Sequence, residues 1–167
     1  VLAREIAAGL NVTAATTTSG ELRFGTCLLN PPSGYTLGDL EQGKRFVSDL
    51  LAGETVRIEG SAPWLAQAKL PEDEQARLAV HVGHVELEPT ANVLMIYPRS
   101  VLVAVSAAVV DLSVAIGEAL HQAKVAVQSV ACLLACETEM ASPALRAAAV
   151  ELGVPLRFAD GAGGVRR

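Results

Sequence analysis

The stretch VLMIYPRSVLVAV, residues 93–105, decides the fold class of this chain. It contains two runs rich in β-forming residues, 93–97 and 101–105, which Pro98 separates. The second run is apolar throughout, and a continuous apolar run is typical of a strand that is covered on both faces, as in a parallel sheet. The stretch therefore predicts two strands within an α/β fold.

Helix and strand signals alternate downstream of this stretch. Asp111 is placed to cap a helix, and Ser142 followed by Pro143 supplies an N-cap and a first-turn proline for a second helix. The predicted elements are helices over residues 111–123 and 142–152, a strand within 125–134 and a strand over 154–158.

Helices and strands are also mixed upstream of the stretch. Leu2, Ile6 and Leu10 recur four residues apart, which predicts an amphipathic helix at the start. Asp39 can cap a second helix, which Gly53 would follow. The predicted elements are helices near residues 2–9 and over 40–51, and strands over 11–18, 55–59 and 77–82.

These elements predict two α/β regions in the chain. Residues 1–98 form a small mixed α/β region, and residues 99–159 form a three-layer α/β domain with a largely parallel sheet, because parallel strands need crossover connections. The glycine-rich residues 160–167 are expected to be a flexible tail. Because the chain starts without a methionine and within a helical pattern, we expect a fragment of a longer protein.

Composition narrows the functional class. The net charge is −5 and no basic run precedes Arg166, which argues against nucleic-acid binding. The apolar run at 101–110 is too short to span a bilayer and no signal peptide is evident, so we expect a cytoplasmic protein with no membrane partner. The three cysteines show no strong metal-binding spacing, and neither a metal nor another cofactor is predicted.

Four ordered blocks carry a resemblance to a known family. AREIAAGLNVTAATTTSGELRFG (3–25) resembles a helix leading into a threonine-rich strand in the CbiG/CobE family of cobalamin biosynthesis proteins. PSGYTLGDLEQGKRFVSDLLAGETVRIEG (32–60) and SAPWLAQAKLP (61–71) are similar to the family's following helix and strand. SPALRAAAVELGVPLRF (142–158) is similar to the end of the CobE-type domain. The resemblance extends over nearly the whole chain.

The resemblance implies a role in building the corrin ring of vitamin B12. Its substrate would be a tetrapyrrole, namely a precorrin or cobalt-precorrin intermediate. One implied activity is that of a cobalt-precorrin-5A hydrolase, which opens a δ-lactone and releases a two-carbon aldehyde; another is handling of an intermediate without chemistry. A precorrin methyltransferase is an implied partner, and a homo-oligomer is possible. The family's N-terminal domain would precede Val1.

The turn after the strand at 101–105 is the first candidate site. The resemblance places the family's G-x-G-C-x-x-G-T turn here, and glycines let such a turn present its amides to a ligand at close range. This chain has Ala107 at the position of the family's cysteine and alanine or valine at the next two. Ser106 and Asp111 are the predicted substrate-binding residues, although the Asp111 carboxylate would compete with an anionic ligand.

The second candidate site is CETEMASP, residues 136–143, where the family shows I-D-L-K-A-D-E-P. Glu137 retains an acid, whereas Glu139 replaces the lysine and reverses the local charge. On a strand or extended turn Glu137 and Glu139 share a side, so they are the predicted catalytic acid and base. A solvated loop at the end of a strand is the alternative interpretation.

Three threonines and two histidines complete the candidates. Thr16, Thr17 and Thr18 match a threonine element of the family, and their hydroxyls bind either substrate carboxylates or the local backbone. His81 and His84 are three residues apart on a predicted strand, so they face opposite ways and are not expected to share a metal. Two functions stay open: a hydrolase, and a non-catalytic corrinoid-binding or scaffold module that acts with a precorrin methyltransferase.

Overall fold

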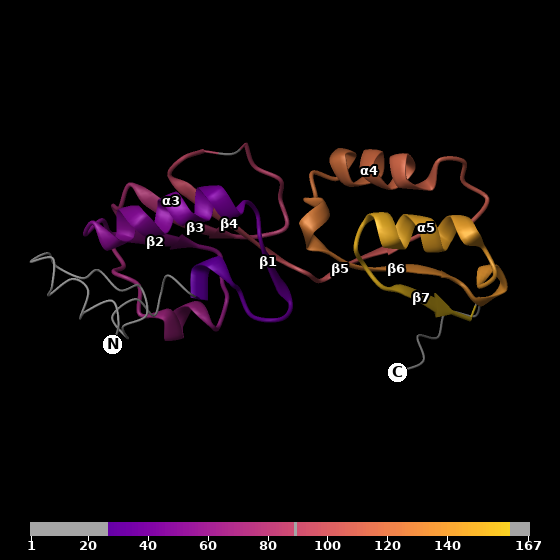
Figure 1. The fold of residues 1–167 in the computed structure, drawn as a ribbon, viewed down its shortest axis with the longest axis horizontal. Coiled ribbons are helices and arrows are strands. Elements are labelled where there is room, and N and C mark those ends of the chain that lie inside the picture. The colour runs from indigo at the N-terminus through magenta and orange to yellow at the C-terminus, as the bar shows by residue number, and fades with distance from the viewer. Residues whose placement is uncertain (1–26, 89, 161–167) are drawn as a thin grey trace, which may run out of the picture.

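Two β-sheets form the framework of the molecule. The computed structural model describes residues 27–88 and 90–160. Figure 1 shows the two sheets side by side along the longest axis of the molecule. One sheet has four strands in the order β1-β4-β3-β2, and the other has three in the order β5-β6-β7. The prediction of an α/β fold is confirmed. No helix in the described part of the chain is long and apolar enough to cross a membrane.

The first sheet is mostly parallel. β2 pairs with β3 and β3 with β4 in parallel, whereas the short β1 pairs antiparallel with β4 at one edge. The strands are β1 (Tyr35–Leu37), β2 (Val56–Glu59), β3 (Leu78–Val82) and β4 (Val93–Pro98). The last three match strands predicted from the sequence, while β1 was not predicted.

Helix α3 (Leu40–Leu51) covers one face of this sheet. Asp39 begins the helix, because its Oδ1 accepts a hydrogen bond of 2.6 Å from the Gln42 amide, as the sequence predicts. Phe46 is fully buried against the sheet. The short 3₁₀ helix η2 (Leu65–Ala68) contributes to the same core. The opposite face of β4 carries Met95 and Tyr97, which pack with Ala126 from the second half.

The second sheet is entirely parallel and carries two helices. Its strands are β5 (Val101–Ala104), β6 (Val130–Cys136) and β7 (Leu156–Ala159). Helices α4 (Leu112–Gln122) and α5 (Pro143–Glu151) connect them, with 3₁₀ turns η3 (Val127–Ser129) and η4 (Glu137–Glu139) on either side of β6. The Ser142 side chain caps α5 as predicted.

The structure refines the predicted layering of this second unit. Because the strands follow one another in the order β5-β6-β7, right-handed crossovers place both helices on the same face. Both helices share one core with Leu133 of β6. The described unit therefore has one helical layer on one sheet. The prediction that β5 is covered on both faces was wrong, since Leu102 is 62% exposed.

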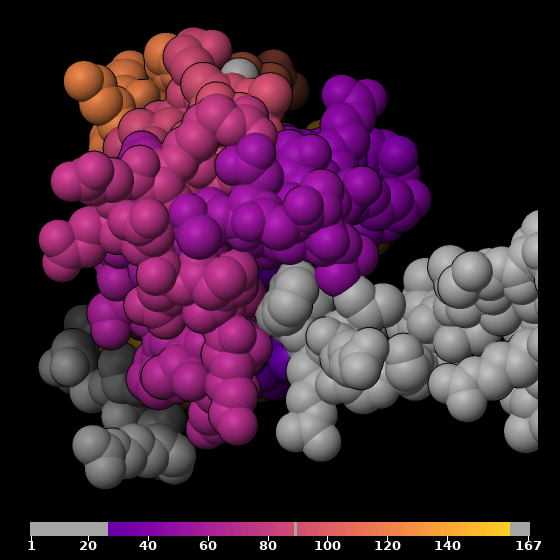
Figure 2. Space-filling view, turned by 90° about the vertical axis from the view of Figure 1, so that its left-hand side faces the viewer, coloured from indigo at the N-terminus to yellow at the C-terminus, as the bar shows by residue number. Residues whose placement is uncertain are grey.

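A second connection holds the two sheets together besides the chain between β4 and β5. Residues Val85 and Val125 form an isolated antiparallel bridge, and the Ala126 amide donates a hydrogen bond of 2.8 Å to the His84 carbonyl. Figure 2 shows the pink surface before β4 adjoining the orange surface of the second half. The two sheets have separate cores, and we propose that they mark two domains divided between Pro98 and Arg99.

Candidate functional site

The two segments singled out in the sequence meet at the carboxyl edge of the second sheet. β5 and β6 are neighbouring parallel strands, with Ala104 opposite Leu134, so the turns that follow them lie side by side. This edge is at the end of the molecule farthest from the first sheet (Figure 1). Parallel α/β sheets bind ligands beyond the carboxyl ends of their strands, which makes this edge the candidate site.

A carboxylate from one segment binds the other segment. Glu139 Oε1 accepts a hydrogen bond of 2.8 Å from the Ser106 hydroxyl and another of 2.8 Å from the Ala107 amide. The Ser106 hydroxyl in turn accepts a bond of 3.3 Å from the Ala108 amide. An amide and a hydroxyl that converge on one oxygen form a binding position for a carboxylate, and here the protein's own side chain occupies it.

The predicted acid pair has a different geometry from the one expected. Glu137 and Glu139 lie in the 3₁₀ turn η4 rather than on extended backbone. A 3₁₀ turn advances by about 120° per residue, so residues two apart point to different sides. Glu137 is exposed, as the alternative interpretation of a solvated loop expects, whereas Glu139 is half-buried. Their assignment as catalytic acid and base stays a prediction.

Of the remaining predicted site residues, the structure describes Asp111 but not the three threonines. Asp111 occupies the N-cap position of α4 with a left-handed backbone (φ 52°), and its exposed side chain makes no capping hydrogen bond. Its backbone carbonyl accepts the first bond of the helix, from the Ala115 amide at 3.0 Å. Thr16, Thr17 and Thr18 lie outside the described residues.

Sequence reasoning missed a thiol at this edge. Cys136 is the last residue of β6, and its Sγ accepts a hydrogen bond of 3.1 Å from the Thr138 hydroxyl. The hydroxyl, followed by the Thr138 backbone amide, lowers the pKa of the Cys136 thiol, because both hydrogen bonds stabilise the thiolate. The signal in the sequence was the spacing of two residues between the thiol and the hydroxyl.

This thiol gives the first testable prediction. Replacing Thr138 by alanine is expected to raise the Cys136 pKa and slow its alkylation by iodoacetamide at pH 7 about threefold to tenfold, since less thiolate is present. Fragmentation of the tryptic peptide 125–146 by tandem mass spectrometry separates Cys136 from Cys132, and Cys27 lies on another peptide. Thr138→Ser retains the hydroxyl and is expected to react at the wild-type rate, so equal slowing in both variants would contradict this account.

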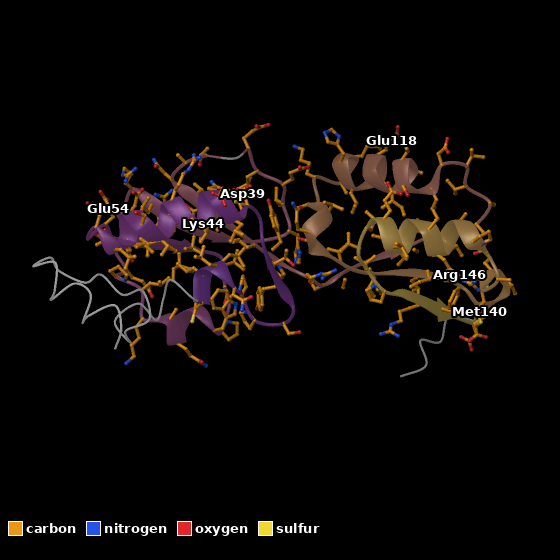
Figure 3. The ribbon with its side chains drawn as sticks, viewed as in Figure 1. Asp39, Lys44, Glu54, Glu118, Met140 and Arg146 are labelled. Atoms are coloured by element: carbon orange, nitrogen blue, oxygen red, sulfur yellow. The ribbon has the colours of Figure 1, made fainter. Side chains whose placement is uncertain are left out.

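A cation also lies at the edge. Arg146, in the second turn of α5, donates a hydrogen bond of 3.0 Å to the Met140 carbonyl, and Figure 3 shows the two residues close together at the end of the second sheet. The guanidinium therefore lies near the acidic turn η4. No group of three or more histidines, cysteines and acids in the described ranges could hold a metal ion.

The histidines contact separate partners. His81 Nδ1 lies 3.2 Å from Glu59 Oε2 on the neighbouring strand. His84 Nε2 lies 3.4 Å from the Ser100 hydroxyl, near the connection between the sheets. Arg57 donates to Glu59 at 2.8 Å and is the main cause that lowers the Glu59 pKa, with His81 second. The two histidines therefore belong to different polar clusters.

The comparisons with known proteins find a likeness among solved structures. No protein-family model matches this chain, and no curated protein matches it. Among solved structures, it is similar to one described as a cobalamin biosynthesis protein G homolog from Sulfolobus solfataricus, with 16% sequence identity and a TM-score of 0.31. The match covers 95% of this chain and 49% of that one, so this chain spans about half the length of that protein.

Proposed function

We propose that this protein acts in cobalamin biosynthesis and binds a corrin-ring intermediate at the carboxyl edge of its second sheet. The pathway rests on the four sequence blocks that resemble the CbiG/CobE family. The position rests on one observation: Ser106 and Glu139, 33 residues apart in sequence, meet in a hydrogen bond at that edge. A precorrin carries carboxylate side chains around its ring, and a carboxylate matches the donors that converge there.

Binding would proceed by exchange of one carboxylate for another. A substrate carboxylate takes the place of Glu139 Oε1 and accepts the hydrogen bonds of the Ser106 hydroxyl and the Ala107 amide. The displaced Glu139 side chain turns towards solvent, which hydrates its charge. Because the incoming group must displace a bound carboxylate, Glu139 lowers the apparent affinity of the site for its substrate. Arg146 at the same edge offsets part of the negative charge.

The geometry supports binding of the intermediate better than its hydrolysis. Lactone hydrolysis requires a base to activate water and free donors to stabilise the oxyanion. Glu139 is engaged by two donors, and the Ala107 amide already donates to it. The turn from Ser106 to Asp111 also lacks the glycines of the family motif, which restricts how its amides approach a substrate. This favours a corrinoid-binding module that presents its ligand to a partner such as a precorrin methyltransferase.

One observation favours the hydrolase as a second candidate function. The Cys136 thiol, whose pKa the Thr138 hydroxyl lowers, ends β6 beside the strand that Ser106 follows. A bound lactone would lie at this edge. The Cys136 thiolate would attack the lactone carbonyl carbon, and the ring C–O bond would break. The released alkoxide would then form the aldehyde carbonyl as the C–C bond that joins its carbon to the macrocycle breaks, and the macrocycle carbon would take up a proton. Water would then hydrolyse the thioester, which yields the free carboxylate and restores the thiol. Glu137 is the candidate base for that water.

A titration separates these functions. Purified protein is mixed with a lactone-bearing cobalt-precorrin, while the absorption spectrum reports binding and a trapping reagent reports released aldehyde. We expect a saturable spectral change with no aldehyde above background. Aldehyde release that disappears in Cys136→Ser would support the hydrolase instead. If millimolar cobalt-precorrin causes no spectral change, both the corrinoid-binding module and the hydrolase are contradicted.

A further inference from the structure

A cleft of about 590 Å³ lies between the first sheet and the C-terminal end of α4, at the opposite end of α4 from the Ser106–Glu139 contact. Its walls come from three places in the sequence: the start of α3, the segment before β4, and the end of α4 with the residues that follow it. The volume is within the range of small-molecule sites, about 300–1,000 Å³. The cleft takes no part in the proposed corrin-binding site.

The floor of the cleft is apolar. Met95 and Tyr97 come from the face of β4 that α3 does not cover, and each is 5% exposed. Gly38 lies directly against them, because a Cβ atom there would be 3.0 Å from Met95 Cβ and 3.1 Å from Tyr97 Cε2. Leu87 adds an apolar side chain that is 39% exposed. An apolar ligand body would displace water from Leu87 and from the small exposed parts of Met95 and Tyr97.

The rim of the cleft is predominantly acidic. Asp39, Glu86 and Glu88 line it, and the basic side chain among the lining residues is Lys124. His121 adds a weakly basic ring. Burial raises the Tyr97 pKa, and the charge of Glu86 raises it further, so the Glu86 carboxylate acts on the floor of the cleft. This field attracts cations and repels the carboxylate-rich ring of a precorrin.

Hydrogen bonds fix the walls in place. The Glu86 amide donates to the Lys124 carbonyl at 3.1 Å, next to the bridge between Val85 and Val125. On the other side, the Gln42 side chain donates to the Val93 carbonyl at 2.7 Å and also to the Thr90 carbonyl. The carboxylates and the apolar floor are therefore held around a preformed cleft, which lowers the entropic cost of binding.

We propose that this cleft binds a small molecule with an apolar body and a primary ammonium group. The apolar body lies over Leu87, Met95 and Tyr97, and the ammonium group pairs with the rim carboxylates. Neutral or anionic molecules of the same shape lack that pairing. The same ammonium group occurs on lysine side chains, and the test separates that source from a free amine.

Phenethylamine is a suitable probe, with phenethyl alcohol as its neutral counterpart and phenylpropionate as its anionic one. Titrations followed by ¹H–¹⁵N NMR are expected to shift the amides of residues 38–42 and 86–88, with phenethylamine at least tenfold tighter than the alcohol and no binding of the acid. Shifts confined to residues that do not line the cleft, or equal affinity for all three probes, would overturn the proposal. Nα-acetyl-lysine amide keeps the side-chain ammonium group of a protein lysine. Tighter binding of this compound than of phenethylamine would overturn the small-molecule assignment.

Two charge variants complete the test. Glu86→Gln retains the shape of the rim and is expected to weaken phenethylamine about fivefold to tenfold. Glu118→Gln removes an equal charge from α4 at a position that does not line this cleft (Figure 3), and it is expected to leave the affinity unchanged. Equal weakening by both variants would indicate a general charge effect and would contradict a specific site. Ser106→Ala should not alter this affinity, which keeps the test independent of the proposed function.

Discussion

Replacing Gly60 by alanine is expected to lower the free energy of unfolding by about 3–5 kcal/mol, near the upper end of single substitutions. Gly60 directly follows β2 and has φ +98°, and a Cβ atom there would lie 2.2 Å from the carbonyl oxygen of Val82 at the end of β3. The side chain therefore strains its own backbone and pushes apart two paired strands. Urea unfolding followed by circular dichroism measures the loss.

Gly53→Ala is the matched control for this substitution. Gly53 also has a positive φ, +103°, but a Cβ atom there would meet nothing within 4 Å. Only the backbone strain remains, and the expected loss is about 1–2 kcal/mol. The difference between the two variants isolates the contact with Val82, so equal losses would contradict the described pairing of β2 and β3.

Replacing Leu133 by alanine is expected to cost about 2–5 kcal/mol, because it leaves a cavity in the second core. Leu133 is fully buried on β6, in the core that α4 and α5 share. Leu102→Ala is its control, since Leu102 lies on the neighbouring strand but is 62% exposed, and its expected change is within about 0.5 kcal/mol. Equal losses from the two variants would contradict the described orientation of the sheet.

Amide hydrogen exchange on the Leu133→Ala variant also tests the proposed division into two domains. If the two cores fold separately, exchange is expected to become faster in β5, β6 and β7 and to stay near the wild-type rate in β2, β3 and β4. A uniform increase over both sheets would show a single cooperative unit and would contradict a domain boundary between Pro98 and Arg99.

The elements that the sequence predicted are those fixed by local interactions. The side chains of Asp39 and Ser142 cap their helices by accepting hydrogen bonds from the amides three residues ahead, so a short window of sequence contains the whole signal. β1 was missed because it has three residues and its pairing with β4 connects positions about sixty residues apart. The uncovered face of β5 was missed because apolar composition does not reveal whether a neighbour covers Leu102.

The residues of the candidate site were singled out from the sequence, but the contacts between them were not predicted. Strand assignments alone place Ser106 and Glu139 at the same edge, because parallel neighbours end together. The hydrogen bonds that Glu139 accepts from Ser106 and Ala107 depend on the 3₁₀ turn η4, which sequence spacing did not predict. The cleft between the sheets could not be predicted at all, since its walls meet through tertiary pairing at Val85 and Val125.

The affinity of the Glu139→Ala variant for a late precorrin tests the central proposal most directly. The Glu139 carboxylate accepts hydrogen bonds from the Ser106 hydroxyl and the Ala107 amide, and its removal is expected to tighten binding about tenfold. Adding Ser106→Ala should cancel most of that gain. Glu137→Ala removes an equal charge from an exposed position in the same turn and should change affinity less than threefold. Unchanged or weaker binding by Glu139→Ala, or an equal gain in Glu137→Ala, would contradict the exchange of carboxylates at this edge.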